Sequence, residues 1–429
     1  MQARVMVAAG IAGLATTGAL ALGSPGAAAA GSAGALDPAF GNGGTVQAAV
    51  GNNPQPTGIV VQGNGDILVG LSLDSQFAVA RFLPSGALDS TFGTGGVAAG
   101  PDVVLGTGQA GPTEIPNSLA VEPSGAIVEA GVGQLANGQF GFGLARFNAN
   151  GTLDQSFGDD GGVAAAVPLD SGEADTVLPE PGGKILVGGT EDTRAGRGVL
   201  MRFDANGTLD TAFGDGGIVV LSSSVPEITA LAIDGNGDIF VPAPAEENNP
   251  NDTGGTTEIS PTGTIDATVT PAAIVASSTG YTPPDAVAFG PAGASVLATN
   301  VGTVKRSFEA EARSFTAAGQ PTAGFQSVPF RYDGSTAATG QDAANAVAVT
   351  PAGQIIIGGY ENTTPDSFGV ERLNANGTPD TTFGNGGGVT TSFPGGGQAQ
   401  AVAVTPGGDI IAAGEDLSTS ELLLAEYLG

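Results

Sequence analysis

The side chains able to carry acid–base chemistry in this sequence are almost all carboxylates. The 429 residues include no Cys and no His, which removes thiolate nucleophiles, the commonest general base and the commonest transition-metal ligand. Trp is absent as well, so a surface that stacks sugars would have to use Tyr or Phe. Any catalysis must therefore use carboxylates, hydroxyls, Tyr, Lys or Arg.

Charged side chains recur directly after one kind of apolar run. "ILVGG" from Ile185 is followed by Thr-Glu-Asp, and "IIAAG" from Ile410 is followed by Glu-Asp. The candidate binding residues at or near such places are Asp74, Glu191, Asp192, Arg194, Arg197, Glu246, Glu247, Glu361, Glu415 and Asp416. If the apolar runs are equivalent strands, these residues lie on one face of the molecule.

Two interpretations of this acidic face stay open. It is either a solvated rim, or a cation-dependent binding or catalytic face. Ca²⁺ is the cation to consider because it is hard and accepts oxygen ligands in loose geometry. No other cofactor is expected, and no residue is assigned a catalytic role from the sequence.

The charge balance excludes several classes of partner. Twelve Lys and Arg residues stand against 42 Asp and Glu residues, which gives a formal net charge of −30. Nucleic acids and anionic lipids are bound through Lys and Arg, so we expect neither as a partner. A large net charge also keeps proteins soluble and monomeric. We therefore expect a monomer without nucleic acid and without stable insertion in a membrane.

The elements that position these residues are repeated, because one phrase occurs four times. It reads "RFLPSGALDSTFGTGG" from Arg81, "RFNANGTLDQSFGDDGG" from Arg146, "RFDANGTLDTAFGDGG" from Arg202 and "RLNANGTPDTTFGNGG" from Arg372. A fragment of the same phrase, "ALDPAFGNGG", begins at Ala35.

A second phrase, of the form A-V-x-x-x-x-G-x-I-L-V-G-G, lies upstream of each copy. Its seven copies begin near residues 57, 117, 174, 228, 284, 345 and 400. The aligned residues Ile67, Ile127, Ile185 and Ile239 are 60, 58 and 54 residues apart. Internal periods of this size indicate solenoids, propellers or arrays.

Each unit has the pattern of four β-strands. Short alternating apolar runs are separated by Gly, Pro and Asn turn signals, and no segment has helical periodicity. Strand A is "AVAV", strand B is "ILVGG" and strand C is "LARF", whereas strand D is expected to run through "LDxxFGxGG" into the residues after it. Four antiparallel strands in each of seven units predict an all-β fold, a single seven-bladed β-propeller over residues 34–429.

The two ends of the chain complement each other. The last unit stops at "ELLLAEYLG", after its strand C, and the segment "ALDPAFGNGGTVQAAV" supplies the missing strand D before the first strand A. We therefore predict that residues 35–50 complete the C-terminal blade. This pairing would close the ring and remove the exposed edge of the last sheet.

The two phrases together resemble the bacterial delta-60 repeat, a propeller-forming domain whose function is unassigned. The resemblance covers roughly residues 35–429. The copies from Ile228 and Pro284 depart from the pattern, the former with "GTIDATVTP" and the latter with "GQPTAGFQSV". The resemblance implies a propeller and supplies no catalytic residues, and it leaves the register of the fourth and fifth units open.

The repeated aromatic and charged residues of the phrase favour a structural role. Phe40, Phe92, Phe157, Phe213 and Phe383 recur in every copy, and a ligand would meet only some copies, so we expect these rings to pack between blades. Each repeat Arg stands eight residues before an Asp of the same phrase. Across a hairpin this spacing predicts a repeated Arg–carboxylate bridge.

The string "NANGTLD" from Asn148 allows two interpretations. Alternating Asn and Asp oxygens before a Gly are typical of calcium loops, but the bidentate Glu of such loops is missing. Asn-Gly between two strands is the strongest hairpin signal. We predict a turn.

The first 33 residues have the three parts of a secretory signal peptide. A basic residue, Arg4, precedes an apolar run from Val5 to Leu22 and then small residues, with cleavage after Ala30 or Ala33. The alternative is an uncleaved membrane anchor. We expect cleavage and release, and hence an extracellular protein.

Two classes of function compete. The first, which the absence of His favours, is a secreted non-catalytic propeller that serves as a binding or scaffold module for an extracellular protein, glycan or surface ligand. The alternative is an extracellular hydrolase or lyase that acts on a polymer through carboxylates, with or without Ca²⁺. The ligand is not identified by the sequence, and a fold does not determine a function.

Overall fold

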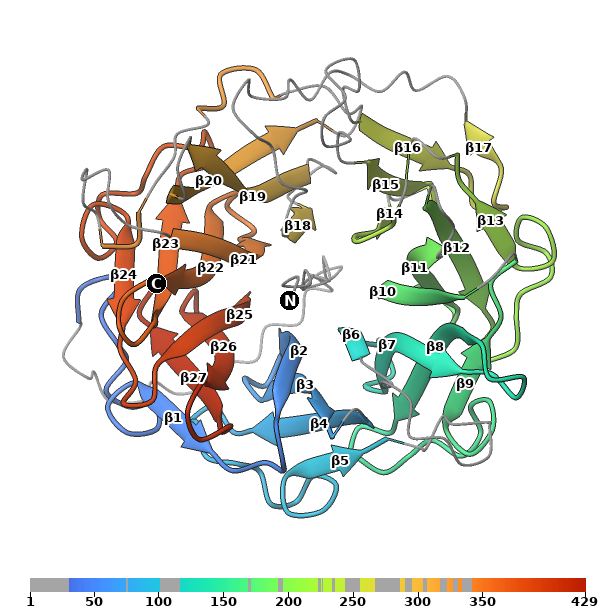
Figure 1. Cartoon of the computed structure of the whole chain (residues 1–429), viewed down its shortest axis with the longest axis horizontal. Helices are drawn as coiled ribbons and strands as arrows, with labels where there is room; N and C mark the ends of the chain where they lie inside the picture. The colour runs from blue at the N-terminus through green and yellow to red at the C-terminus, as the bar shows by residue number, and fades with distance from the viewer. Residues whose placement is uncertain are drawn as a thin grey trace, which may run out of the picture.

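The computed structural model describes most of the chain from residue 31 to the C-terminus (Figure 1). The described residues are 31–74, 76–100, 116–168, 171–191, 196–222, 225, 227–233, 236–243, 255–266, 286–289, 295–303, 307–316, 322–326, 331–333 and 342–429. Within these ranges the chain forms 27 β-strands and no helix. The prediction of an all-β chain is confirmed.

The strands form antiparallel sheets, of which seven lie among the described residues. Six have four strands, and the sheet of β18, β19 and β20 has three. We number them along the chain as sheet 1 (β2–β5), sheet 2 (β6–β9), sheet 3 (β10–β13), sheet 4 (β14–β17), sheet 5 (β18–β20), sheet 6 (β21–β24) and sheet 7 (β25–β27 with β1). Figure 1 shows them arranged around a common centre, as in a β-propeller.

Each sheet has an inner strand, nearest the common centre in Figure 1, and a second strand paired with it. The inner strands are β2 (Gln55–Val61), β6 (Pro116–Val121), β10 (Gly172–Pro179), β14 (Ala232–Ile233), β18 (Ala286–Phe289), β21 (Asp342–Val349) and β25 (Gly397–Val404). The second strands are β3 (Ile67–Leu73), β7 (Ile127–Gln134), β11 (Ile185–Glu191), β15 (Ile239–Ala243), β19 (Ser295–Thr303), β22 (Ile355–Glu361) and β26 (Ile410–Asp416).

A third strand and an outer strand complete the sheets. The third strands are β4 (Gln76–Phe82), β8 (Phe140–Phe147), β12 (Arg197–Phe203), β16 (Gly255–Ile259), β20 (Ser307–Phe315), β23 (Ser367–Leu373) and β27 (Leu422–Tyr427). The outer strands among the described residues are β5 (Val97–Ala99), β9 (Gly162–Ala165), β13 (Ile218–Val220), β17 (Ile265–Asp266), β24 (Gly388–Thr391) and β1 (Thr45–Ala48).

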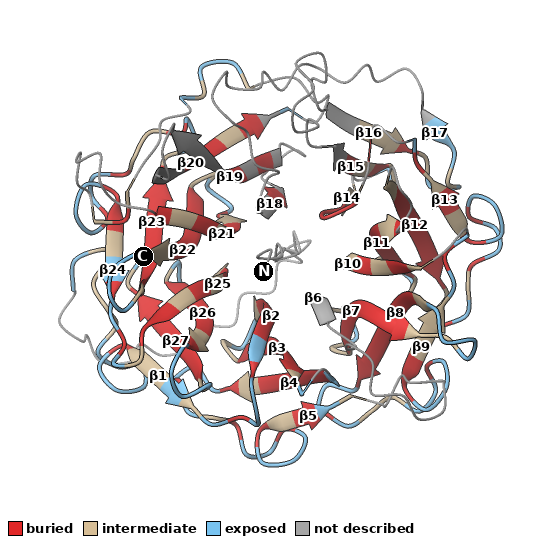
Figure 2. Ribbon diagram, in the orientation of Figure 1, coloured by how far each residue is buried: buried red, intermediate tan, exposed pale blue. Residues whose placement is uncertain are grey.

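The hydrophobic core lies between consecutive sheets. Where burial is described, Figure 2 shows the second and third strands as mostly buried. One cluster joins Val128 and Phe142 of sheet 2 to Val187 of sheet 3, and another joins Leu424 of sheet 7 to Phe82 of sheet 1. Each fully buried side chain of this size stabilises the fold by about 1.5–3 kcal/mol.

The segment "LDxxFGxGG" is a series of turns, so the prediction that strand D runs through it is wrong. The outer strand of sheet 1 begins only at Val97. Before it, Asp89 Oδ1 accepts hydrogen bonds from the backbone N of Thr91 (2.9 Å) and from its hydroxyl (2.6 Å). An Asp that binds the backbone two residues ahead makes an Asx turn, and Gly93 and Gly95 follow with positive φ. The Asx turn and the left-handed glycines therefore keep this segment from pairing as a strand.

The N-terminal segment pairs with the C-terminal strand as the sequence predicts. Strand β1 lies antiparallel to β27, with Thr45 opposite Ala425 and Ala48 opposite Leu422. The backbone N of Gly34 donates to Leu428 O (2.8 Å). Sheet 7 therefore takes its outer strand from the other end of the chain (Figure 1).

One backbone hydrogen bond is repeated from sheet to sheet. In most copies an amide in the turns before an outer strand donates to a carbonyl in the turn after the third strand of the next sheet; we call this the turn-to-turn bond. The name also covers the equivalent bonds donated by Gln326 of the fifth unit and accepted by Ala33 of the N-terminal segment. Its donors and acceptors are Gly41 and Ser85, Gly93 and Asn150, Gly158 and Asn206, Gly214 and Thr262, Gln326 and Asn376, and Gly384 and Ala33, at 2.7–3.0 Å. The residue after each of the acceptors Asn150 and Asn206 is a Gly with positive φ.

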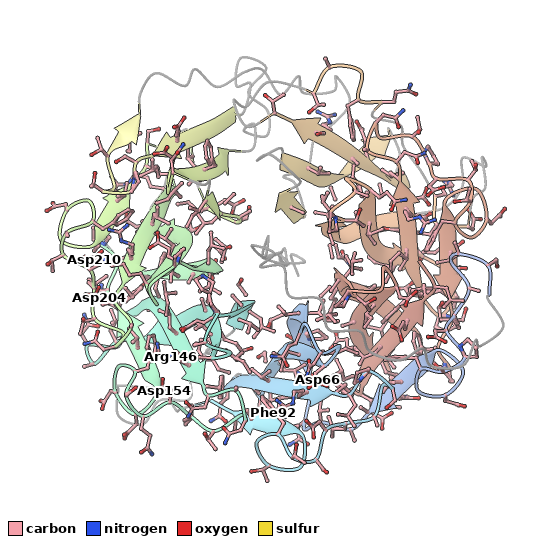
Figure 3. All side chains as sticks on the ribbon, turned by 180° about the vertical axis from the view of Figure 1, so that it is seen from behind. Asp66, Phe92, Arg146, Asp154, Asp204 and Asp210 are labelled. Carbon is pink, nitrogen blue, oxygen red and sulfur yellow. The ribbon has the colours of Figure 1, made fainter. Side chains whose placement is uncertain are left out.

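The predicted Arg–Asp bridges are confirmed. Arg146 donates through Nε and Nη2 to Asp154 Oδ2 at 2.8 and 2.6 Å (Figure 3), and Arg202 Nε donates to Asp210 at 2.8 Å. The guanidinium of Arg202 also lies 4.3 Å from the ring centroid of Phe213. The repeated Phe rings are fully buried, so the packing interpretation is confirmed as well.

The same Arg side chains tie one sheet to the next. Arg81, Arg146 and Arg202 each donate through Nη1 to a backbone carbonyl of the following sheet, those of Ala149, Ala205 and Pro261, at 2.6–2.8 Å. The turn that accepts this bond is the one predicted for "NANGTLD", in which Asn150 Oδ1 accepts hydrogen bonds from Thr152. The turn interpretation is therefore confirmed.

The turn-to-turn bond requires Gly at the tip of the accepting turn. Gly151 has φ +82°, and a Cβ there would lie 2.6 Å from the N of Gly93. Gly216 has φ +65° with no atom within 4 Å of its Cβ position, so it is the matched control. We expect Gly216→Ala to cost about 1–2 kcal/mol for the left-handed backbone. Gly151→Ala should cost at least twice as much in urea unfolding, and equal losses would contradict the close approach.

Candidate functional site

The structure places the predicted acidic residues in different surroundings. Asp74 is exposed and accepts a hydrogen bond from Asn52 Nδ2 (3.1 Å). Glu191, Glu361 and Asp416 end the second strands of sheets 3, 6 and 7. Four predicted residues lie outside the described residues: Asp192, Arg194, Glu246 and Glu247.

Glu191, Glu361 and Asp416 share one register position. They lie opposite the first residue of the inner strand, which is Gly172 in sheet 3, Asp342 in sheet 6 and Gly397 in sheet 7. These three carboxylates are therefore equivalent in register. Their partners differ, and the partners decide what each carboxylate can do.

Glu191 is held in an ion pair. Its side chain is fully buried, and Oε2 accepts a hydrogen bond from Arg197 Nη2 at 2.7 Å. Arg197, also predicted as a binding residue, lies directly opposite Glu191 on the next strand. Both residues are thus joined to each other across the sheet, which favours a structural role.

Asp416 organises a loop. Its Oδ1 accepts hydrogen bonds from the N of Ser418, the hydroxyl of Ser418 and the N of Thr419, each at 2.8 Å. Its Oδ2 accepts a hydrogen bond from Gln47 Nε2 of β1 at 3.2 Å. Burial raises the pKa of Asp416, but the hydrogen bonds from Ser418 and Thr419 outweigh it and hold the pKa below its usual value. Its oxygens are occupied by the protein itself.

Glu361 lies among other charged groups. It is opposite Asp342, which is 1% exposed. Burial raises the pKa of Glu361, the negative charges of Asp333 and Asp342 raise it further, and the positive charge of Arg331 opposes them. We call Glu361, Asp342, Asp333 and Arg331 the Glu361 cluster. It combines a carboxyl group that tends to hold a proton with nearby carboxylates and a guanidinium.

Tyr332 positions the part of the cluster that comes from a distant segment. Its ring lies against Gly369, its hydroxyl donates to Ala343 O (3.2 Å), and its backbone N donates to Asp342 Oδ2 (3.2 Å). Tyr332 is fully buried. Since Gly369 leaves room for the ring, residues 331–333 lie on sheet 6.

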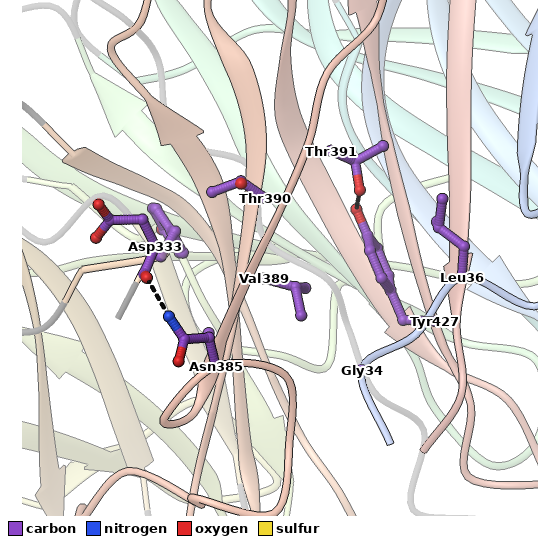
Figure 4. A pocket seen from close by; sticks show the side chains of 10 residues that line it. Gly34, Leu36, Asp333, Asn385, Val389, Thr390, Thr391 and Tyr427 are labelled. Carbon is purple, nitrogen blue, oxygen red and sulfur yellow. Dashed lines mark hydrogen bonds between the residues drawn. The ribbon is translucent and has the colours of Figure 1, made fainter. Parts of the chain in front are cut away.

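A pocket of about 380 Å³ adjoins the cluster (Figure 4). Its lining residues are Gly34, Leu36, Tyr332, Asp333, Asn385, Gly388, Val389, Thr390, Thr391 and Tyr427. Asn385 Nδ2 donates to Asp333 O (2.8 Å), and the Tyr427 hydroxyl donates to Thr391 Oγ1 (2.9 Å). The pocket lies between β24 and the N-terminal segment, and Asp333 belongs to both the pocket and the cluster.

A second unusual carboxyl group lies behind the pocket. Glu371 is 2% exposed, and burial raises its pKa to about 9. A Cβ on Gly388, which lines the pocket, would lie 2.5 Å from Glu371 Oε2. Glu371 is thus neutral near pH 7 and separated from the pocket by the backbone of Gly388.

The sequence did not single out Asp333, Asp342 or Arg331. Asp342 could have been noticed from the sequence, because the equivalent position is glycine in two other sheets, Gly172 in sheet 3 and Gly397 in sheet 7. Asp333 precedes Glu361 by 28 residues and belongs to a divergent unit, so only the packing of Tyr332 brings the two together.

The residues that the structure describes do not provide a metal centre from the predicted rim. Among them, no group of three or more Asp and Glu side chains is arranged to hold a metal ion. Glu191 is neutralised by Arg197, and the Asp416 oxygens are filled by the loop. Glu415 is half-buried, and burial raises its pKa.

Four segments of the chain match the model of one protein family, described as "Domain of unknown function (DUF5122) beta-propeller". The matched residues are 62–92, 122–157, 181–213 and 351–383, each ending on a repeat Phe. These four segments are similar to the β-propeller repeats of this family. The predicted resemblance to a propeller repeat of unassigned function is confirmed, and the two departing units are not among the matched segments. No curated protein matches the chain.

Several solved structures share the fold of these DUF5122 repeats. A catalytically inactive virginiamycin B lyase from Staphylococcus aureus, solved with quinupristin, is 12% identical with a TM-score of 0.50, over 90% of this chain and 99% of that chain. A gluconolactonase from Xanthomonas campestris is 12% identical with a TM-score of 0.40, over 92% and 93%. A glucose dehydrogenase is 11% identical with a TM-score of 0.39, over 90% and 99%. At such identities the likeness shows the fold alone.

These neighbours correct the main functional prediction. A non-catalytic binding or scaffold module was favoured because the chain lacks His, but the neighbour with a TM-score of 0.50 is named as a lyase. The main interpretation is therefore wrong, and an enzymatic function of this chain is a proposal. Within the described part of the chain no helix is long and apolar enough to cross a membrane.

A substitution at Asp416 tests whether this residue organises its loop or binds calcium. Asp416→Asn should cost about 1–3 kcal/mol, because buried donors lose their charged acceptor, and the loss should be equal with millimolar CaCl₂ and with NaCl at matched ionic strength. Urea unfolding gives the loss of unfolding free energy in each of the two salts. The substitution Glu415→Gln, one residue away, is the control. A loss confined to CaCl₂ would instead reveal a cation site on the rim.

Proposed function

We propose that this protein is an extracellular hydrolase that cleaves a neutral polymer, with a glycan as the favoured substrate class, through the carboxyl groups of the Glu361 cluster. The observation that carries the proposal is the raised pKa of Glu361 beside two further carboxylates and Arg331. Pairs of titratable groups whose surroundings push their pKa values apart provide the acid and the base of one reaction.

The roles follow from these surroundings. Glu361 holds a proton more readily than an ordinary carboxyl group and donates it to the leaving oxygen. Asp333, which lines the pocket, acts as the base or nucleophile on the substrate bound there. Arg331 lowers the pKa of Glu361 and so opposes the effect of the two neighbouring carboxylates. Tyr332 holds Asp333 in place through its contacts with sheet 6.

The charge of the whole chain selects among substrates. A net charge of −30 repels polyanions such as uronate polymers, on which a lyase would act. A neutral polymer meets no such barrier, and this favours hydrolysis over elimination. The proposed reaction uses no metal ion, and calcium is included only as a condition of the assay.

The scaffold we propose for this activity is a closed ring of seven blades. Support comes from the turn-to-turn bonds, which join sheet 6 to sheet 7 through Ala33 and sheet 7 to sheet 1 through Ser85. The pairing of β1 with β27 and the cluster shared by sheets 7 and 1 agree with closure. The segments 267–285 and 317–321, at which such a bond from sheet 4 to sheet 5 is expected, lie outside the described residues.

The test of the activity uses three variants. Glu361→Gln and Asp333→Asn should each lower kcat on a responsive neutral polysaccharide by roughly 10²–10⁴-fold, the usual contribution of a general acid or base. Glu415→Gln, a half-buried Glu outside the cluster, should leave the rate unchanged. Wild-type activity should fall as the pH rises through the raised pKa of Glu361, because the acid must be protonated.

The assay is release of reducing ends from a panel of neutral polysaccharides, with and without CaCl₂. Wild-type rates in both cluster variants would contradict the assignment. Products with an unsaturated ring, detected by ultraviolet absorbance, would identify a lyase instead. No product from any polymer would contradict the hydrolase.

Export is part of the proposal, and the structure favours one of the two cleavage positions. Ala33 O accepts the turn-to-turn bond from Gly384 N at 3.0 Å. Cleavage after Ala30 retains this acceptor, whereas cleavage after Ala33 removes it. Intact mass spectrometry of the exported protein should therefore give a chain that begins at Gly31. A chain beginning at Gly34, or uncleaved protein in the membrane fraction, would contradict this.

A further inference from the structure

Sheet 7 reverses a charge that the other repeats keep. Glu426 of β27 lies opposite Ile411 of β26. The same register position holds Arg81 in sheet 1, Arg202 in sheet 3 and Arg372 in sheet 6. In those sheets the Arg forms the bridge to the Asp of the repeat phrase, so sheet 7 has a carboxylate where its sisters have a guanidinium.

The Asp partner is retained in sheet 7. Asp37 N donates to Glu426 O at 2.9 Å, just as Asp89 N donates to Arg81 O at 2.8 Å. Asp37 belongs to the N-terminal fragment of the repeat phrase, a few residues before β1. The bridge of the other sheets is thus replaced by two carboxylates, one from each end of the chain.

A third carboxylate, that of Asp409, also stands where another sheet has a positive charge. Asp409 directly precedes the second strand of sheet 7, at the position of Lys184 in sheet 3. Lys184 Nζ donates to Asp210, the repeat Asp of its own sheet. Asp409 has no positive charge to offer Asp37, and its Oδ1 accepts a hydrogen bond from Gly429 N (2.9 Å).

The surroundings of Glu426 penalise its ionised form. The residue is 7% exposed, and its pKa is raised to about 7 by burial and by the negative charges of Asp409 and Asp37. The neighbouring sheet contributes the turn around Ser85, which has no titratable side chain.

We propose that the attachment of the N-terminal closing segment, residues 33–48, is controlled by protons. When Glu426 carries a proton taken up from solvent, the segment is held against β27. When Glu426 loses that proton, repulsion from Asp37 and Asp409 loosens the segment. The device opens and closes sheet 7 with pH and does not depend on the proposed enzymatic activity.

The direction of the pH effect follows from linkage. The pKa of Glu426 is higher in the folded protein than the usual value of 4.5, so the attached state binds the proton more tightly. The stabilisation is fully present below the unfolded pKa and is lost as the pH rises through about 7. Attachment is therefore firm in mild acid and weak in mild alkali.

Hydrogen exchange of the β1 amides tests the proposal. The matched reference is β5, the outer strand of sheet 1, whose segment is secured by the Arg81–Asp89 bridge. After correction for intrinsic exchange, protection of β1 relative to β5 should fall by roughly tenfold or more between about pH 5.5 and about pH 8.5. A ratio independent of pH would overturn the proposal.

Three variants identify the responsible group. Glu426→Gln should remove the pH dependence of the ratio, and Glu426→Arg, which restores the repeat bridge to Asp37, should keep β1 protected at both pH values. Glu371→Gln replaces another buried Glu with a raised pKa and should leave the dependence intact. A dependence that survives Glu426→Gln would overturn the proposal.

Discussion

The hydrogen bond from one sheet's turns to the next sheet's turn is the interaction on which this fold depends. Five of the six donor amides lie in the turns of the phrase "LDxxFGxGG", and five of the six acceptor carbonyls lie in the turn after the third strand of the following sheet. The exceptions are the donor Gln326 in the divergent fifth unit and the acceptor Ala33 in the N-terminal segment. A buried strand pair alone does not specify where its neighbour sits. The repeated backbone bond, with a Gly at the tip of the accepting turn, fixes that position and leaves no room for a Cβ.

The Arg of each repeat reinforces this link and explains the composition of the phrase. One guanidinium binds the Asp of its own sheet, lies over a buried Phe and donates to the backbone of the next sheet. A single side chain thereby neutralises a carboxylate inside the structure and joins two units. Where the repeat departs from this plan, at Glu426 and in the segment around Asp333, the structure has carboxyl groups with raised pKa values.

Much of the fold could be predicted from the sequence because its contacts are local and repeated. The hairpins, the bridge from Arg202 to Asp210 and the pairing of β1 with β27 all follow from spacing and from the incomplete last unit. The turns before the outer strands were misassigned because the Asx turn of Asp89 and the glycines after it prevail over the alternating pattern.

The site was harder to predict, since carboxylates equivalent in register have different partners. Glu191 meets Arg197, whereas Glu361 meets Asp342 on the paired strand and Asp333 through the packing of Tyr332 on sheet 6.

The central claim is that the two ends of the chain close one cooperative ring. A circular permutant tests it most directly, with Gly429 joined to Gly31 by a short Gly-Ser linker and new ends opened at the exposed turn at Gly138. The account predicts a single unfolding transition, at a urea concentration equal to or above that of the parent, because Gly34 already bonds to Leu428. A permutant that unfolds in several steps, or well below the parent, would contradict closure.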